Sequence, residues 1–135
     1  MNAIMDTGPW VALIDRSEGR HKQCVNWFEA FRGNLFSTEP VLTEVLHLLD
    51  FSVQARSAAI DFVLARAITL VPSTVSSLKR TKGLMEKYAD LPMDFADATL
   101  VCTADDLSLQ RIVTFDTKDF GIYRFHSREP FVLLP

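Results

Sequence analysis

The chain has 135 residues, of which 48% are hydrophobic and 23% charged. This composition excludes an intrinsically disordered chain, and we expect residues 1–135 to form a single domain around one core. The net charge of −3 excludes a protein that holds nucleic acid by bulk positive charge. It does not exclude a protein that cuts nucleic acid, because a metal site must concentrate carboxylates.

The first third of the chain predicts two strands and two helices. Residues 2–6 are typical of a short buried strand, and a helix is expected to follow with Pro9 in its first turn. Residues 20–31 place apolar side chains at helical spacing, and Gly33 is expected to end that helix. Residues 35–37 are expected to form a second short strand.

The middle of the chain predicts two helices followed by a strand. Pro40 is expected to open the first helix. Its apolar stripe consists of Val41, Val45, Leu48 and Leu49. Residues 53–66 are expected to form the second helix, and the β-branched residues 68–71, closed by Pro72, a strand.

The last part of the chain continues the alternation. Residues 74–88 and 95–107 predict helices, and residues 111–115 and 131–134 predict strands. Strands that alternate with helices favour an α/β fold, in which helices flank a mainly parallel sheet.

The sequence contains no sign of export or membrane insertion. No apolar run approaches the roughly 20 residues that a membrane span needs, and no basic region followed by an apolar stretch opens the chain. The two cysteines, Cys24 and Cys102, lie far apart and form no CxxC pair. We therefore expect reduced, packed thiols in a cytoplasmic protein that has no membrane partner.

Four acidic residues occupy positions where a site is expected. Asp6 ends the first predicted strand and Asp116 ends the strand 111–115, and ligands of open α/β sheets gather at the carboxyl ends of strands. Asp97 lies in the first turn of a predicted helix, and Glu44 lies in the otherwise apolar Pro40 helix. Each acid alone is also compatible with helix capping, turn formation or solvation.

The four acids together predict a divalent cation. Two unit charges ~6 Å apart at an effective dielectric of ~20 repel by about 3 kcal/mol, or roughly two pKa units. Four converging carboxylates are therefore unfavourable unless a cation lies among them. Oxygen-only ligands suit Mg²⁺ or Mn²⁺.

At these residues the chain resembles the PIN-domain nucleases, and within them the VapC-type toxins of bacterial toxin–antitoxin pairs. The resemblance spans nearly the whole sequence. It is carried by residues 5–13 (MDTGPWVAL), 40–46 (PVLTEVL), 91–98 (LPMDFADA), 112–120 (IVTFDTKDF) and the C-terminal FVLLP.

The resemblance implies a three-layer α/β/α fold, often dimeric, that cleaves RNA with Mg²⁺ or Mn²⁺ and leaves 5′-phosphate and 3′-hydroxyl ends. It identifies the acidic quartet as Asp6, Glu44, Asp97 and Asp116. It also implies that Thr114 hydrogen-bonds the acids. Asp94 lies three residues before Asp97, so a helix that starts early would put both on one face, and we rank Asp94 as the first substitute for Asp97. Asp119 is expected to have a structural role.

Within this quartet we expect Asp6 and Asp97 to anchor the principal metal ion. Glu44 and Asp116 are expected to hold coordinated waters, complete a second metal site or position the attacking water. The basic candidates for RNA binding are Arg20, Lys22, Lys79, Arg80, Lys82, Lys118 and Arg124.

Two other functions remain open at this point. A metal-dependent phosphatase also keeps aspartates at strand ends, although the usual pair of aspartates separated by one residue is absent after the first strand, where Asp6 precedes Thr7 and Gly8. A non-catalytic PIN-like binding module is the other alternative. The toxin interpretation further implies a small cognate antitoxin that inserts a basic residue into the acidic pocket.

Overall fold

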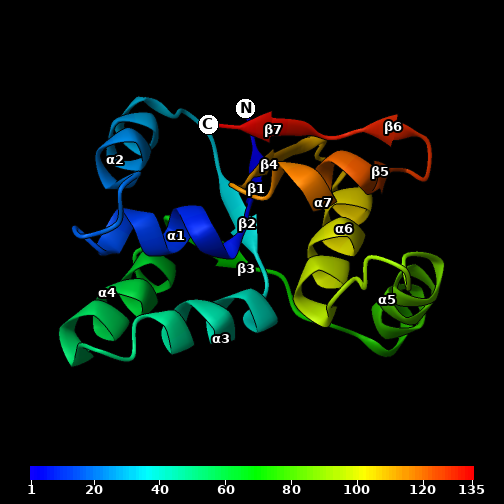
Figure 1. Ribbon diagram of the computed structural model, residues 1–135, viewed down its shortest axis with the longest axis horizontal. Coiled ribbons are helices and arrows are strands. Elements are labelled where there is room, and N and C mark those ends of the chain that lie inside the picture. Colours follow the sequence, from blue (N-terminus) through cyan, green and yellow to red (C-terminus); the bar gives the residue numbers. More distant parts are fainter.

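Five short strands form a fully parallel sheet in the computed structural model, which describes residues 1–135 (Figure 1). The strand order is β3-β2-β1-β4-β7. The strands are β1 (Ala3–Met5), β2 (Leu35–Ser37), β3 (Ile68–Leu70), β4 (Arg111–Val113) and β7 (Val132–Leu134). Two further strands, β5 (Arg124–Phe125) and β6 (Glu129–Pro130), form a separate antiparallel pair.

Helices cover both faces of the sheet, which confirms the predicted three-layer α/β/α fold. One layer consists of α1 (Thr7–Ile14), α2 (His21–Ala30), α3 (Glu39–Leu48) and α4 (Val53–Leu64). The opposite layer consists of α5 (Val75–Lys87), α6 (Phe95–Leu107) and α7 (Thr117–Ile122). Figure 1 shows the sheet nearly edge-on between these two groups of helices. No helix is both long enough and apolar enough to cross a membrane.

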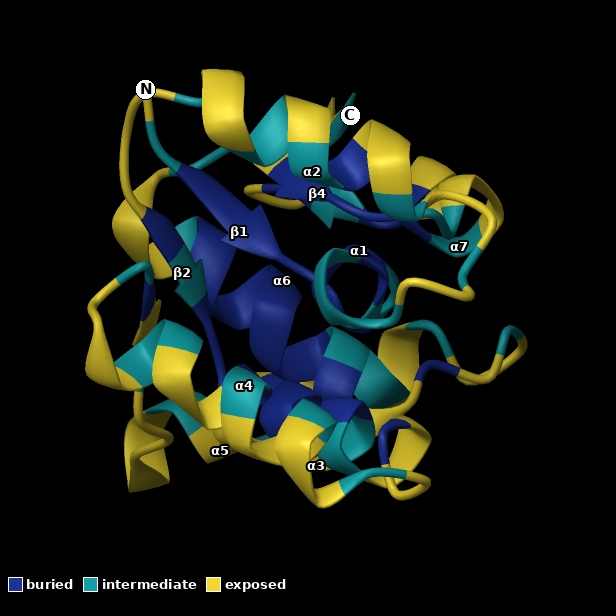
Figure 2. Ribbon diagram, turned by 90° about the vertical axis from the view of Figure 1, so that its left-hand side faces the viewer, coloured by how far each residue is buried: buried dark blue, intermediate teal, exposed yellow.

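The core is centred on β1 and α6 (Figure 2). The three residues of β1 are fully buried because the strand lies in the middle of the sheet with a helical layer on each face. Helix α6 buries eight of its thirteen residues, and these are mostly small side chains such as Ala98 and Ala104, which let the helix approach its neighbours closely. Both cysteines are buried and free, as expected.

The order in which strands are added to the sheet reverses at β1. The segments after β1 and β2 build the sheet toward β3, whereas β4 and β7 are added on the other side of β1. Adjacent strands β1 and β4 therefore lead into helices on opposite faces, which leaves a crevice outside their carboxyl ends. This crevice is where the fold places the candidate site.

Local side-chain bonds explain where several helices begin. Ser52 accepts a hydrogen bond from the Ala55 amide at the start of α4. Thr74 and Ser77 form a reciprocal capping box at the start of α5. Each bond satisfies a backbone N–H that has no partner within the helix.

The structure differs from the sequence prediction at several points. Helix α2 ends at Ala30, before Gly33, because Phe31 already has extended backbone angles of −68° and 132°. Gly33 instead has a φ of 155°, and a Cβ there would lie 1.2 Å from the Met1 carbonyl oxygen. Leu48, predicted in the apolar stripe of α3, is 53% exposed. Strand β4 ends two residues early, and α7 and the β5–β6 pair were not predicted.

Candidate active site

Four segments bring acidic side chains to the carboxyl edge of the sheet. Asp6 follows β1 directly, and its amide donates a 3.0 Å hydrogen bond to the Val113 carbonyl of β4. Asp116 follows β4 and is the N-cap of α7. Asp97 lies in the first turn of α6, and Glu44 lies in α3. The reversal of strand order at β1 therefore brings residues that are distant in the sequence to the same edge of the sheet.

The tightest carboxylate group consists of Asp97, Asp116 and Asp119. One carboxylate oxygen from each residue lies within 4.8 Å of the others. Asp119 is the residue for which we expected a structural role, and its amide donates a 2.9 Å hydrogen bond to Oδ1 of Asp116, the N-cap of α7. Its carboxylate nevertheless lies in the cluster. The signal for this position is its i, i+3 spacing from Asp116, which places both acids on one face of a helical turn.

Asp6 lies beside this group and is almost fully buried, with 9% of its surface exposed. The hydroxyl of Thr114 donates a 2.7 Å hydrogen bond to Oδ2 of Asp6 and accepts a 2.9 Å hydrogen bond from the Asp116 amide. Burial raises the pKa of Asp6 to about 6, the hydrogen bond from Thr114 opposes this rise, and the charges of Glu44 and Asp116 add to it. Thr114 thus connects two of the acids.

Asp97 is the most strongly perturbed acid. Burial raises its pKa to about 8, and the charges of Asp6 and Asp94 contribute further to the rise. The phenol of Tyr123 donates a 2.9 Å hydrogen bond to Oδ2 of Asp97. Burial, together with the negative charge of Asp97, raises the pKa of Tyr123, which keeps this phenol a neutral donor.

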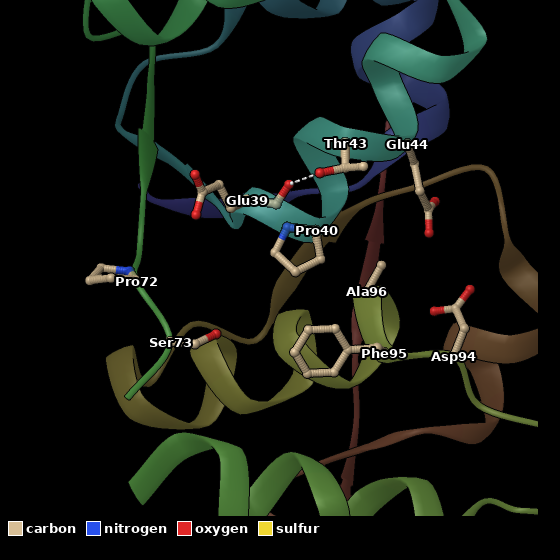
Figure 3. A pocket seen from close by; sticks show the side chains of 9 residues that line it. All are labelled: Glu39, Pro40, Thr43, Glu44, Pro72, Ser73, Asp94, Phe95 and Ala96. Atoms are coloured by element: carbon tan, nitrogen blue, oxygen red, sulfur yellow. Dashed lines mark hydrogen bonds between the residues drawn. The ribbon is translucent and has the colours of Figure 1, made fainter. Parts of the chain in front are cut away.

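Glu44 and Asp94 form the outer edge of the site, where their carboxylates face each other (Figure 3). Oε2 of Glu44 accepts a 3.0 Å hydrogen bond from the Thr7 hydroxyl. Partial burial raises the pKa of Glu44, and the charge of Asp94 acts in the same direction. Helix α6 starts at Phe95, so Asp94 is its N-cap and accepts a 2.8 Å hydrogen bond from the Asp97 amide. Asp94 therefore fixes the turn that carries Asp97.

These acids fit a hard divalent cation. Every ligand atom of the tight group is a carboxylate oxygen, which suits Mg²⁺ or Mn²⁺. The pKa of Asp6 and that of Asp97 are both raised, which means that the protein does not supply the positive charge that would keep them ionised. A divalent ion bound among them would supply that charge.

Two basic side chains belong to, or pack on, the segment that carries Asp116: Lys118, whose charge opposes the rise in the pKa of Asp119, and Arg20. The guanidinium of Arg20 stacks on the ring of Phe115, 4.3 Å from its centroid. The ring in turn covers Gly8, where a Cβ would approach it to 2.9 Å. Phe115 stands between Thr114 and Asp116 in the sequence, so this stacking ties Arg20 to the segment that carries Asp116.

Other predicted basic residues are engaged elsewhere. Arg80 forms an ion pair with Asp106, and Lys82 lies 3.2 Å from Glu86 on the same helix. Arg124 donates a 2.8 Å hydrogen bond to the carbonyl of Gly121. These contacts favour surface roles for Arg80, Lys82 and Arg124.

The sequence matches the model of the PIN domain over residues 3–125. The chain belongs to the PIN-domain family. A comparison with curated proteins gives no significant match.

Solved structures with the same PIN fold include bacterial toxins. The crystal structure of Mycobacterium tuberculosis VapC20, a toxin that cleaves the sarcin–ricin loop, has a TM-score of 0.78 at 19% identity and covers 86% of this chain and 91% of its own. FitAcB from Neisseria gonorrhoeae has a TM-score of 0.65 at 13% identity, and the match covers 98% of this chain and 96% of its own. VapBC2 from Rickettsia felis, bound to a DNA fragment from its promoter, has a TM-score of 0.60 at 14% identity. This match covers 98% of this chain and 97% of its own. This PIN chain therefore combines the fold of these toxins with an acidic cluster.

Proposed function

We propose that this PIN chain is a metal-dependent endoribonuclease whose residues 1–135 act as one domain. The observation that carries the proposal is the group of three carboxylates from α6 and α7, with oxygens within 4.8 Å of one another, beside the buried Asp6. Such a concentration of negative charge at the carboxyl edge of a parallel sheet is unfavourable without a cation, and a cation there is suited to phosphodiester hydrolysis.

We assign Asp97 and Asp116 to holding Mg²⁺ or Mn²⁺, together with Asp119 and the neighbouring Asp6. An ion held by these residues would acidify a coordinated water and neutralise charge on the phosphate. Thr114 keeps Asp6 oriented through its hydroxyl, and Tyr123 does the same for Asp97. Glu44, held by Thr7, lies on the α3 side, where it orients the attacking water.

We assign Arg20 to binding the RNA backbone. Its guanidinium has no carboxylate partner within ion-pair distance and is held in place by Phe115. A fixed cation at the rim offsets the repulsion between the acidic cluster and an approaching phosphate.

We further propose that the protein is the toxin of a toxin–antitoxin pair and forms a homodimer. The support is the fold that it shares with VapC20, and with the Rickettsia felis VapC crystallised together with its VapB partner. The acidic pocket favours an antitoxin that inserts a basic side chain. Growth arrest on expression, relieved by the product of a small adjacent gene, is the expected result. Absence of both would refute the toxin role but leave the nuclease role intact.

The nuclease proposal is tested with purified protein, single-stranded RNA and Mg²⁺ or Mn²⁺. We expect internal cleavage that EDTA abolishes and that Asp6→Asn and Asp97→Asn each reduce at least about a hundredfold. Asp90→Asn, an exposed acid outside the cluster, is the matched control. Hydrolysis of small phosphomonoesters instead of RNA would identify a phosphatase, and RNA binding without cleavage would identify a binding module.

A further inference from the structure

A cavity of about 720 Å³ opens beside the acidic cluster. It lies between the first turns of α3, the start of α6 and the segment that links β3 to α5 (Figure 3). Glu44 and Asp94 face each other at one end, and Ser73 lies at the other end (Figure 3). The cavity is therefore continuous with the candidate site and leads away from it. Its volume is within the range of clefts that bind small ligand groups.

An aromatic side chain forms one wall of this cavity. Phe95 is the first residue of α6, and 38% of its side chain is exposed although it is apolar. Figure 3 shows its ring on the opposite side of the cavity from the ring of Pro40. Two flat apolar surfaces across an open space suit a planar ligand, and exposed aromatic rings are the usual stacking surfaces for unpaired bases.

The charges around the cavity determine which part of an RNA can enter. Three carboxylates line it, those of Glu39, Glu44 and Asp94, and no lysine, arginine or histidine does. A phosphate group is repelled by this lining, because like charges at short range cost free energy. An uncharged base is not repelled, and its amino group finds carboxylate and hydroxyl acceptors. The lining thus selects a base and excludes the sugar–phosphate backbone.

We propose that this cavity binds an unpaired RNA nucleobase next to the scissile phosphate, stacked on Phe95 and donating an amino hydrogen to Glu39. The proposal rests on the ribonuclease function above and names the base subsite of that enzyme. It assigns specificity to Phe95 and Glu39, neither of which belongs to the acidic cluster. Adenine, guanine and cytosine carry the required amino group, whereas uracil does not.

Stacking is tested by RNA affinity, separately from catalysis. In protein made inactive by Asp97→Asn, Phe95→Ala is expected to weaken binding of a short fluorescein-labelled single-stranded RNA about tenfold in a fluorescence anisotropy titration. Leu107→Ala is the matched control, because Leu107 is a similarly exposed residue (39%) at the opposite end of the same helix. It is expected to change the affinity less than twofold. Equal affinities for the two variants would overturn the proposal.

Base selection is tested by sequencing the RNA ends that the active protein produces from a pool of random sequence. The wild type is expected to cut with uracil depleted at one position beside the cleaved bond, and Glu39→Gln is expected to weaken that depletion. Glu29→Gln, which changes an exposed glutamate on α2, is expected to leave the pattern unchanged. An unchanged pattern in both Phe95→Ala and Glu39→Gln would overturn the base subsite.

The possible failures are distinguishable. If the wild type cuts no RNA, the proposed ribonuclease function fails, and the base subsite fails with it. If the wild type cuts RNA and both Phe95→Ala and Glu39→Gln cut it with the wild-type pattern, only the subsite fails. If Phe95→Ala changes the oligomeric state in light scattering without changing base preference, Phe95 belongs to an interface between copies, and the proposal is wrong.

Discussion

Tyr123 donates a hydrogen bond of 2.9 Å to Oδ2 of Asp97, although 26 residues separate the two in sequence. The tyrosine is fully buried, and its ring makes edge contacts with Tyr88 and Phe120, each at a centroid distance of 5.1 Å. The core therefore fixes the direction of the phenol, and the phenol fixes one oxygen of Asp97. This is the most direct connection between the packing of the protein and its acidic cluster.

Tyr123→Phe is expected to weaken Mn²⁺ binding about tenfold, because the ring stays in place while Asp97 loses its donor. The bond from Tyr123 lowers the pKa of Asp97, so its removal also moves the acidic limb of the Mn²⁺-binding profile to higher pH. Calorimetric titrations over a pH series measure both effects. Tyr88→Phe is the control, and equal Mn²⁺ affinities in all three proteins would contradict the role of Tyr123.

The metal-free protein is expected to lose stability as the pH rises. Asp97 has a pKa of about 8 in the folded protein and an ordinary value of 3.8 when unfolded, so folding favours its protonated form. The stability gained from Asp97 is complete below pH 4 and is lost as the pH rises toward 8. The pKa of Asp6 is raised to about 6, so the stability gained from its protonated form is likewise lost as the pH rises from 4 to 6. Each pKa unit corresponds to about 1.4 kcal/mol of unfolding free energy.

Asp97→Asn is accordingly expected to raise the Tm of the metal-free protein at pH 8 by about 5 °C or more, because the variant removes an unfavourable buried charge. At pH 4 the Tm difference is expected to nearly vanish. Thermal unfolding in EDTA at the two pH values measures this. A lower Tm for Asp97→Asn at pH 8 would mean that the carboxylate is stabilised by the protein itself.

Thr114→Val is expected to lower stability by about 1–3 kcal/mol and to abolish most RNA cleavage. The substitution keeps the shape of the side chain but leaves buried Asp6 without its donor and the Asp116 amide without its acceptor. Thr114→Ser retains the hydroxyl and is expected to retain most of the cleavage rate. Equal losses of cleavage in the two variants would show that the hydroxyl alone does not account for the role of Thr114.

Arg20→Ala is expected to raise the KM for RNA about threefold to tenfold with little change in kcat, because the guanidinium contacts the backbone away from the reacting atoms. The slope of log affinity against log salt concentration is expected to fall in magnitude by about one. Arg32→Ala is the control, because Arg32 is an exposed arginine that donates to the carbonyls of Glu29 and Phe31. A fall in kcat with an unchanged KM would place Arg20 in a different role.

The sequence predicted the fold where hydrophobic spacing was long and regular. Helix α6 was predicted with its observed bounds because its small and apolar residues extend over thirteen positions. The three residues of β2 were also predicted. Helix α7 has only six residues, too few for a periodic pattern. The β5–β6 pair has two residues in each strand, too few for an alternating pattern. Gly33 was predicted to end α2, whereas it allows close approach to the Met1 carbonyl. No local sequence pattern indicates this contact, because Met1 is distant in the sequence.

The site was only partly predictable for the same reason. The positions of Asp6 and Asp116 follow from strand ends, and the structure places both at the same edge. The carboxylate of Asp119 was assigned a structural role because the short helix that turns it inward was not recognised. The Tyr123 bond to Asp97 depends on aromatic packing between distant segments, and no local pattern indicates it.

The most direct test of the acidic cluster is an anomalous difference map from crystals of the protein grown with Mn²⁺. We predict a strong peak coordinated by the carboxylates of Asp97 and Asp116, and its loss in Asp97→Asn crystals grown under the same conditions. The absence of any peak among these carboxylates at millimolar Mn²⁺, in crystals whose RNA-cleaving activity has been verified, would contradict the account.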